Sequence, residues 1–224
     1  MAQQLILDLP VRTSLDRGDF FVSDVNRLAL ARLEQPTTWP NGKLVLAGPE
    51  GAGKTHLAHI WAEREGARLL HPPDLEGLDI GSIEESVAFD DADRIQGSAE
   101  RALLHLHNQV AASGNCLLLT AHRAPRHWKV GLPDLRSRME ATDVVRIDAP
   151  DEALLAAVLM KLFSDRQNTV TPSAISWLAR HMDRSFADAQ CIVAELDARA
   201  LAERRKVTRD LAAEVLDKHR DKGP

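Results

Sequence analysis

A glycine-rich segment at residues 48–55, GPEGAGKT, constrains the fold of this chain more than any other part of the sequence. It has the spacing of a phosphate-binding loop, in which a glycine and four further residues precede glycine, lysine and a hydroxyl residue. An apolar run comes before it at 43–47, and a helical pattern follows it to Gly66. A glycine turn with a chance lysine is the alternative, and the strand–loop–helix context argues against it. The segment therefore predicts a P-loop.

The residue types in this loop predict how it would hold a nucleotide. Gly51 and Gly53 allow backbone N–H groups to turn toward phosphate oxygens, and the start of the following helix adds a favourable dipole. Lys54 is expected to reach the β- and γ-phosphates, and Thr55 to offer its hydroxyl to Mg²⁺. We expect ADP or ATP with Mg²⁺ as the ligand. The expected contacts in the loop are Gly48, Pro49, Glu50, Gly51, Ala52, Gly53, Lys54, Thr55 and His56.

Apolar runs that alternate with helical patterns predict an α/β fold in the first two thirds of the chain. The helical patterns cover residues 23–35, 54–66 and 98–113, with Ser23 and Ser98 as expected N-caps. The runs that read as strands are 43–47, 67–70, 86–90, 116–120 and 143–147. Such alternation is typical of a mostly parallel sheet with helices on both faces.

Beyond Pro150 the sequence contains only amphipathic helical patterns, which predict a second, all-α domain. They cover residues 151–165, 172–182, 186–204 and 208–219. We therefore expect a nucleotide-binding α/β domain at 11–149 and a small helical domain at 150–224. The apolar peptide at 1–10 ends at Pro10 and stands apart from both.

An apolar strand that ends in two carboxylates, VAFDD at 87–91, follows the loop by one helix and one strand. In P-loop proteins an aspartate at such a strand end orients Mg²⁺ and its water, and Asp90 suits that role. Asp91 points elsewhere and is expected to polarise an attacking water. The alternative is a solvated turn in the acidic run DDAD, which the P-loop makes less favourable.

Composition and charge exclude several classes of protein. The chain has 28 Lys+Arg and 33 Asp+Glu, a net charge of −5, which argues against a basic protein that coats DNA. No apolar run approaches the ~20 residues that cross a bilayer, and no secretory signal is evident. Cys116 and Cys191 are far apart in sequence, as is typical of buried thiols in a reducing compartment. We therefore expect a cytoplasmic protein without a membrane partner.

Beside these motifs, several stretches resemble the AAA+ ATPases of the family of the bacterial replication initiator DnaA. Residues 21–31 resemble the family's N-terminal segment, which packs beside the adenine. LLLTAHRAPRHW at 117–128 is similar to the sensor 1 segment, and MDRSFADAQ at 182–190 to the sensor 2 segment of the helical lid. LPDLRSRM at 132–139 is similar to the box that carries an arginine finger.

This resemblance implies the AAA+ fold, a P-loop NTPase sheet sandwiched by helices and followed by a small all-α lid. It also implies roles for residues outside the P-loop. Phe21, Val22 and Asn26 would lie beside the adenine, and Arg184 would reach the bound phosphates from the lid, unless it is an ordinary solvent-exposed charge. Arg138 would be the arginine finger, supplied in trans to a partner's nucleotide, and Arg136 is close enough in sequence to be confused with it.

Within this family the chain is most similar to the Hda group, the regulatory inactivators of DnaA. Members of that group bind the sliding clamp of DNA polymerase III through a short peptide and stimulate hydrolysis of DnaA-bound ATP. The matching peptide lies at the N-terminus, and its expected clamp contacts are Gln4, Leu5, Leu7 and Leu9. An edge strand in the chain's own sheet is the alternative for these leucines. The same peptide could bridge two copies into a homodimer.

Two departures from the family pattern affect the expected activity. The initiators carry a helix-turn-helix domain after the lid, and this sequence stops at Pro224, so we expect no sequence-specific DNA binding. Sensor 1 usually has an acidic residue where His122 stands, which puts hydrolysis of the chain's own ATP in doubt. An ATPase that hydrolyses its own ATP to remodel or load a replication protein stays as the second hypothesis.

Overall fold

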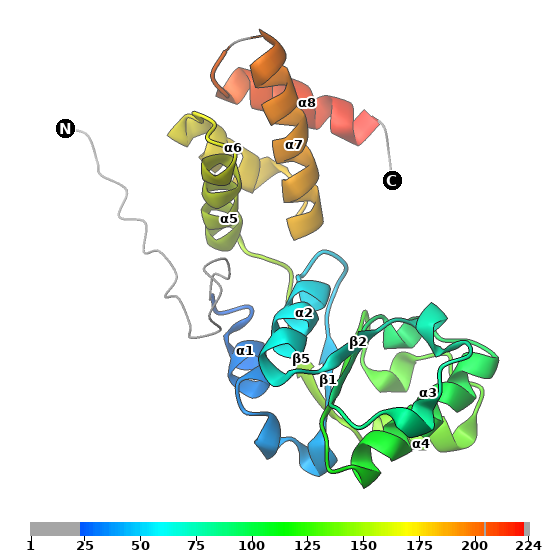
Figure 1. Cartoon of the computed structure of the whole chain (residues 1–224). Helices are drawn as coiled ribbons and strands as arrows, with labels where there is room; N and C mark the ends of the chain where they lie inside the picture. The colour runs from blue at the N-terminus through cyan, green and yellow to red at the C-terminus, as the bar shows by residue number, and fades with distance from the viewer. Residues whose placement is uncertain (1–22, 204, 222–224) are drawn as a thin grey trace. The chain divides into compact units, whose positions relative to one another are not determined.

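The computed structural model describes residues 23–203 and 205–221, which fall into two compact units. One unit covers Asp24–Asp148, and the other consists of helices that follow Ala149 (Figure 1). None of the helices in these ranges is both long enough and apolar enough to cross a membrane.

The first unit is built on one parallel sheet, as the alternating pattern predicts. Its neighbouring strands pair in parallel in the order β2-β3-β4-β1-β5, so the strand that leads into the P-loop is flanked on both sides. The strands are β1 (Lys43–Ala47), β2 (Arg68–Leu70), β3 (Val87–Phe89), β4 (Leu117–Ala121) and β5 (Asp143–Arg146). Because the strands are parallel, their carboxyl ends meet at one edge of the sheet.

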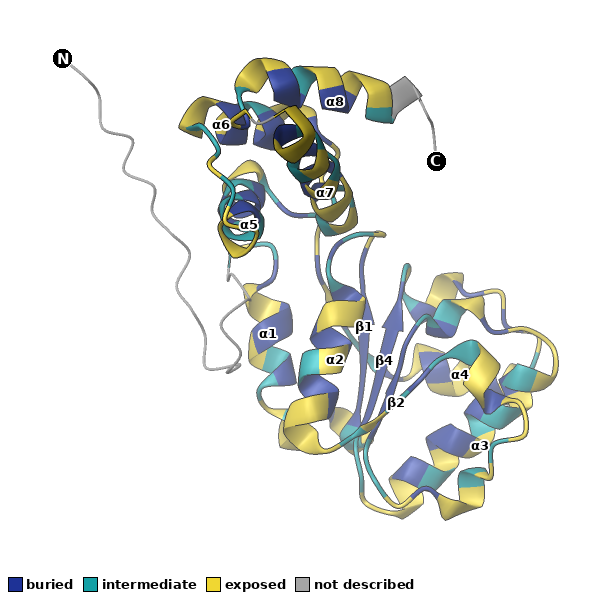
Figure 2. Ribbon diagram, turned by 45° about the horizontal axis from the view of Figure 1, so that its top comes forward, coloured by how far each residue is buried: buried dark blue, intermediate teal, exposed yellow. Residues whose placement is uncertain are grey.

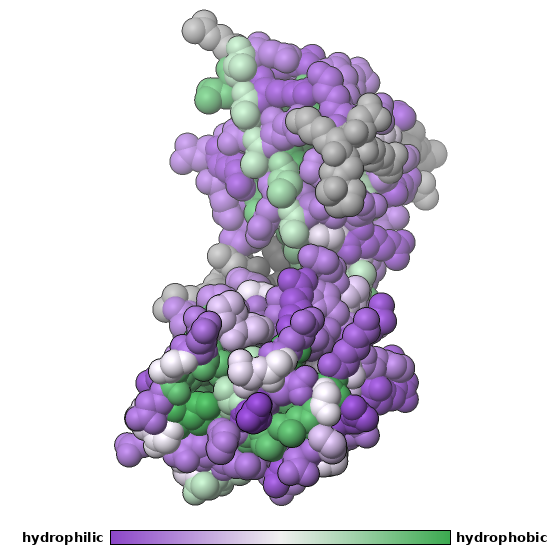
Figure 3. Space-filling model, turned by 90° about the vertical axis from the view of Figure 1, so that its right-hand side faces the viewer, coloured by the Kyte–Doolittle hydropathy of each residue, from purple (hydrophilic) through white to green (hydrophobic). Residues whose placement is uncertain are grey.

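Helices cover both faces of this sheet, so the central strands β1, β3 and β4 are buried at every position, whereas the edge strands β2 and β5 are partly exposed. Figure 2 shows α1 and α2 on one face and α3 and α4 on the other, each with its buried side toward the strands. Figure 3 shows hydrophilic side chains over much of one face of the molecule, with apolar surface gathered in recesses between them. The helices are α1 (Arg27–Leu33), α2 (Lys54–Glu65), α3 (Ser98–Ala112) and α4 (Pro133–Glu140).

Two tryptophans close the core on the α2 side. Trp61 of α2 is fully buried, and its ring stacks on Trp39 with centroids 5.3 Å apart and planes 25° apart. Both indole rings therefore belong to the core of this unit.

Two predicted helix caps are wrong. The first helix begins at Arg27, with Asn26 rather than Ser23 as its N-cap, and the carbonyl of Val25 accepts a hydrogen bond from Asp148 N at 3.3 Å. That contact holds residues before α1 against the end of β5. The helix α3 begins at Ser98 itself, and its N-cap is Gly97, whose φ of 61° favours glycine over serine.

The second unit is a bundle of four helices with its own core. Asp151 caps the first through a 2.8 Å bond from Leu154 N, and Thr208 lies directly before the last. The helices are α5 (Glu152–Asp165), α6 (Pro172–His181), α7 (Phe186–Glu203) and α8 (Arg209–Asp221). Their apolar faces meet around Leu159, Leu178 and Leu196.

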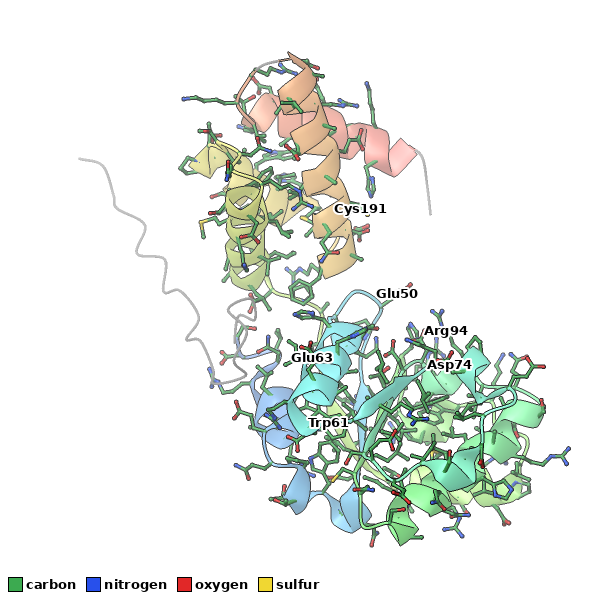
Figure 4. All side chains as sticks on the ribbon, in the orientation of Figure 1. Glu50, Trp61, Glu63, Asp74, Arg94 and Cys191 are labelled. Carbon is green, nitrogen blue, oxygen red and sulfur yellow. The ribbon has the colours of Figure 1, made fainter. Side chains whose placement is uncertain are left out.

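Both cysteines are free thiols. Cys116 is half-buried, whereas Cys191 on α7 is exposed (Figure 4), so the prediction that both are buried is wrong for Cys191.

Candidate functional site

The loop between β1 and α2 has the backbone that its glycines predict. Gly51 and Gly53 have φ angles of 71° and 86°, in the left-handed region that favours glycine. A Cβ atom at Gly48 would lie 2.3 Å from the carbonyl oxygen of Ile147, so only glycine lets the loop leave the sheet this close to the chain after β5. Figure 4 shows Glu50 at the tip of this loop, beyond the end of β1.

Lys54 opens α2 with its side chain directed back into the loop. It is 6% exposed, and its Nζ donates a 2.8 Å hydrogen bond to the carbonyl oxygen of Pro49. Burial lowers the pKa of Lys54, and the carboxylates of Asp91, Asp93 and Asp90 act in the opposite direction. A cation held across a glycine-rich loop in this way suits the binding of a polyphosphate.

Asp90, directly after β3, receives hydrogen bonds from two threonine hydroxyls. Thr55 Oγ1 donates to Asp90 Oδ2 at 2.9 Å, and Thr120 Oγ1 of β4 donates to Asp90 Oδ1. Thr120 is fully buried and also accepts a 3.0 Å hydrogen bond from the backbone N–H of Asp91. The structure thus brings together Lys54, Thr55 and Asp90, which sequence reasoning assigned to phosphate and Mg²⁺. A hydroxyl and a carboxylate are oxygen ligands of the kind that Mg²⁺ prefers, so these side chains fit that ion.

Beside Asp90, a second polar group surrounds Asp91. The φ of Asp91 is 55°, in the left-handed region that few residues other than glycine adopt. His122 Nδ1 lies 3.3 Å from Asp93 Oδ1 and 3.9 Å from Asp91 Oδ1, and its backbone N–H donates to Asp93 Oδ2 at 3.0 Å. Arg94 Nη1 lies 3.5 Å from Asp91 Oδ2. The residue that departs from the family pattern, His122, is therefore held by Asp93.

Sequence reasoning missed Asp93 and His71. The ring of His71, after β2, places Nδ1 at 3.8 Å from Asp90 Oδ2. His71 directly follows a predicted strand, which is the signal that could have found it, because parallel strands end at the same edge. Asp93 lies in the acidic run DDAD, and the sequence alone does not show which carboxylates of this run contact other residues and which are solvated.

The two candidate arginines of residues 132–139 have different surroundings on α4. Arg136 donates from Nε at 3.2 Å and from Nη2 to the carbonyl oxygen of Val130, so its guanidinium is used within the chain. Arg138, in the last turn, is exposed, and within the described residues its guanidinium has neither a hydrogen bond nor an ion pair. The carboxylate of Glu100 accepts from the N–H groups of Gly131 and Leu132, at 3.0 and 2.7 Å, which fixes the chain ahead of α4.

Other predicted site residues lie apart from this group. Asn26 is buried at the start of α1, and His56 is exposed on the first turn of α2. Arg184 is exposed on the loop between α6 and α7 in the helical unit, and its approach to a nucleotide stays a prediction. The predicted contacts Gln4, Leu5, Leu7, Leu9, Phe21 and Val22 lie outside the described residues.

No protein-family model matches this chain, and solved structures show what its fold is similar to. Domain III of the Thermotoga maritima replication initiation protein DnaA matches with a TM-score of 0.76 at 17% identity, covering 93% of this chain and 98% of that one. AMPPCP-bound DnaA from Aquifex aeolicus matches with a TM-score of 0.70 at 17% identity, covering 91% and 68%.

A third similar structure is the Thermotoga maritima RuvB Holliday junction branch migration motor. Its TM-score is 0.67 at 18% identity, and the match covers 87% of this chain and 68% of that one. At these identities the similarity shows the fold. The predicted fold, a parallel α/β sheet covered by helices and followed by a helical unit, is confirmed.

Proposed function

We propose that this chain is a nucleotide-binding AAA+ regulator of replication initiation of the Hda type. In this proposal it binds ADP or ATP with Mg²⁺, is tethered in the cytoplasm to the sliding clamp of DNA polymerase III, and stimulates hydrolysis of ATP bound to DnaA. The resulting loss of ATP-bound DnaA represses re-initiation.

The P-loop group supports the nucleotide part of the proposal. Lys54 would contact the phosphates, while Thr55 and Asp90, joined by a 2.9 Å hydrogen bond, would hold Mg²⁺ and its water. The phosphates of the bound nucleotide would place negative charge next to the buried ammonium of Lys54. The lid arginine, Arg184, would contact the same phosphates.

The observation that carries the regulatory part is the contrast between Arg136 and Arg138. Arg136 is engaged by the carbonyl of Val130, whereas the exposed guanidinium of Arg138 keeps its N–H donors available to a second protein. An arginine supplied in trans neutralises charge that develops on a γ-phosphate. The Glu100 contacts ahead of α4 support this role, because a finger must be presented on a rigid element.

Clamp tethering rests on the sequence pattern of the N-terminal peptide. Leu5, Leu7 and Leu9 alternate, so an extended chain would place all three on one face. An apolar groove that buries two leucines could supply roughly 3–6 kcal/mol before ordering costs, which suits weak to moderate binding.

Replacing the proposed finger tests this function directly. Arg138→Ala should leave nucleotide and clamp binding intact but remove stimulation of DnaA ATP hydrolysis, since a finger in trans contributes about 10³–10⁵ in rate. The assay follows ATP-loaded DnaA with this chain and a DNA-loaded clamp. Arg101→Ala, an exposed arginine on α3, is the matched control and should stimulate like the wild type. Stimulation that survives Arg138→Ala would overturn the assignment.

A second candidate function is hydrolysis of the chain's own ATP in order to remodel or load a replication protein. The contact between Thr55 and Asp90 favours it, because the group that would position Mg²⁺ is intact, with Asp91 next to it. Purified chain alone, assayed by thin-layer chromatography with and without DNA and clamp, separates the two. Turnover without DnaA supports the second function, and its absence together with stimulation of DnaA supports the first.

A further inference from the structure

A buried lysine at the start of β1 has no carboxylate partner among the described residues. Lys43 is 6% exposed, and its Nζ hydrogen bonds to Nδ1 of His107 on α3 at 3.1 Å. His107 is itself 5% exposed. Buried lysines are normally paired with an acidic group, because removing an ammonium ion from water is costly. An ammonium that meets an imidazole instead of a carboxylate therefore needs an explanation.

The protonation states of this pair leave net positive charge in the fold. Burial lowers the pKa of His107 to about 4, and the charge of Lys43 adds to this, so Nδ1 accepts the hydrogen bond at neutral pH. Burial lowers the pKa of Lys43 to about 8, and the neighbouring guanidinium of Arg138 acts in the same direction. At pH 7 Lys43 is still mainly protonated, so two cations from different elements face one another.

These two cations line a pocket of about 370 Å³, here called the Lys43 pocket. Asn41, His107 and Thr142 contribute further polar groups, and Ala111 and Ala141 line it with apolar surface. The hydroxyl of Thr142 is used by the carbonyl oxygen of Arg138, at 2.8 Å. A water takes about 30 Å³ of liquid, so this space admits a tetrahedral oxyanion together with water.

The Lys43 pocket is separate from the P-loop. Lys43 is the first residue of β1 and Ala47 the last, so at ~3.3 Å per residue they lie about 13 Å apart, at opposite ends of the strand. Figure 1 shows α3 and α4, which carry His107 and Arg138, together on one side of the sheet. Three elements distant in sequence thus converge on a site that the P-loop chemistry does not use.

We propose that the Lys43 pocket binds an oxyanion of the phosphate class, held by the ammonium of Lys43 and the guanidinium of Arg138. The ammonium of Lys43 has two N–H donors besides the one that it gives to His107. None of the N–H donors of the Arg138 guanidinium is used by another described residue. Such an anion would neutralise the positive charges of Lys43 and Arg138, which have no acidic partner among the described residues. Its source is either free phosphate or the terminal phosphate of a nucleotide held by a partner protein, and the second source rests on the proposed function.

Calorimetry with the full chain tests the pocket without any partner. The P-loop is first saturated with AMPPCP and Mg²⁺, and inorganic phosphate is then titrated at pH 7. We expect phosphate to bind to the wild type, and Lys43→Met to weaken this binding at least tenfold. The matched control is Lys129→Met, an exposed lysine outside the pocket, which should bind phosphate like the wild type.

A spectroscopic readout locates the anion. Phosphate should shift the imidazole ¹⁵N resonances of His107 in the wild type, because the ammonium that donates to Nδ1 also contacts the anion. The shift should persist in Lys54→Ala, which alters only the P-loop. No phosphate binding at millimolar concentration, or equal binding by wild type and Lys43→Met, would overturn the proposal. A thermal melt verifies that each variant is folded.

The two sources are separated by stimulation of DnaA. If the ligand is the terminal phosphate of the partner's nucleotide, Lys43→Met lowers stimulation and inorganic phosphate inhibits the wild type. If the ligand is free phosphate, Lys43→Met loses phosphate binding and stimulates normally. Because the calorimetric test involves no DnaA, failure of the pocket and failure of the proposed function give different results.

Discussion

The hydroxyl of Thr55 donates a 2.9 Å hydrogen bond to the carboxylate of Asp90, 35 residues later in the chain. This contact joins the helix after the P-loop to the end of β3. The same carboxylate is held by Thr120 of β4, so hydroxyls from two other segments fix the position of one acidic group. An acidic group that is fixed before its ligand arrives loses little entropy on binding.

Thr120→Val should lower both stability and Mg²⁺-dependent nucleotide affinity. Valine has the same shape but leaves Asp90 without one donor and the N–H of Asp91 without its acceptor, at a cost of about 1–3 kcal/mol in the free energy of unfolding. Denaturant unfolding measures the first effect, and calorimetry with ADP, with and without Mg²⁺, measures the second. Thr38→Val, an exposed threonine, is the control. Equal loss of affinity with and without Mg²⁺ would argue against Asp90 as the Mg²⁺ residue.

Lys54→Ala should weaken nucleotide binding by a few kcal/mol. The change removes a charge-assisted contact to the phosphates, and such contacts contribute about 1.5–3 kcal/mol each. Calorimetric titration with ADP measures it, with Lys129→Ala as the control. The same affinity in wild type and Lys54→Ala would contradict the assignment of residues 48–55 as the nucleotide site.

Lys43→Met should stabilise the chain in phosphate-free buffer at pH 7, by on the order of 2 kcal/mol. Folding lowers the pKa of Lys43 from 10.5 to about 8. Below pH 8 Lys43 is protonated in both the folded and the unfolded chain, and burial of this charge lowers the free energy of unfolding by its full amount. Between pH 8 and 10.5 the unfolded chain binds more protons at this site than the folded chain does, and the cost disappears as pH rises.

The difference in unfolding free energy between Lys43→Met and wild type should therefore shrink from pH 8 to pH 10.5. Urea unfolding at a series of pH values measures it. The charged and titratable groups near Lys43 are His107 on α3 and Arg138 on α4, and His107, with a pKa of about 4, is neutral throughout this range. A difference that does not change with pH would contradict the account of Lys43 as a buried cation without an acidic partner.

Deletion of residues 1–10 should abolish binding to the sliding clamp and change the melting temperature little. The expectation follows from an apolar face at Leu5, Leu7 and Leu9 that ends at Pro10. A pull-down with the clamp and a thermal melt measure the two effects. A large fall in melting temperature with clamp binding retained would support an edge strand in place of a clamp anchor. A homodimer that dissociates when clamp is added would indicate that the peptide also bridges two copies.

The strands of the α/β unit could be predicted from sequence because each is a short apolar run between breakers. The predicted run 43–47 matches β1 in full, and the other four differ from the structure by one or two residues at their ends. The helix α4 was not predicted, although Pro133 at its start and the four-residue spacing of Leu135 and Met139 are helical signals.

Contacts between strand ends could not be predicted, since they depend on strand order. That β3 lies beside β4 is what brings Asp93 to His122 and Thr120 to Asp90. The order of the strands in the sheet cannot be read from the order of the strands along the chain. The Lys43 pocket has the same origin, because it needs the start of β1, the middle of α3 and the end of α4 in one place.

The stacked pair Trp39 and Trp61 gives the α/β unit its own optical signature. Two indoles 5.3 Å apart in a rigid core couple electronically and produce a strong near-ultraviolet circular dichroism band, which vanishes when that core melts. The helical unit carries one tryptophan, Trp177, whose ring stacks on His181 at 4.4 Å. Because this ring pair lies in the helical unit, it is separate from the Trp39–Trp61 pair. The near-ultraviolet band of the indole pair therefore follows the melting of the α/β unit without any added label.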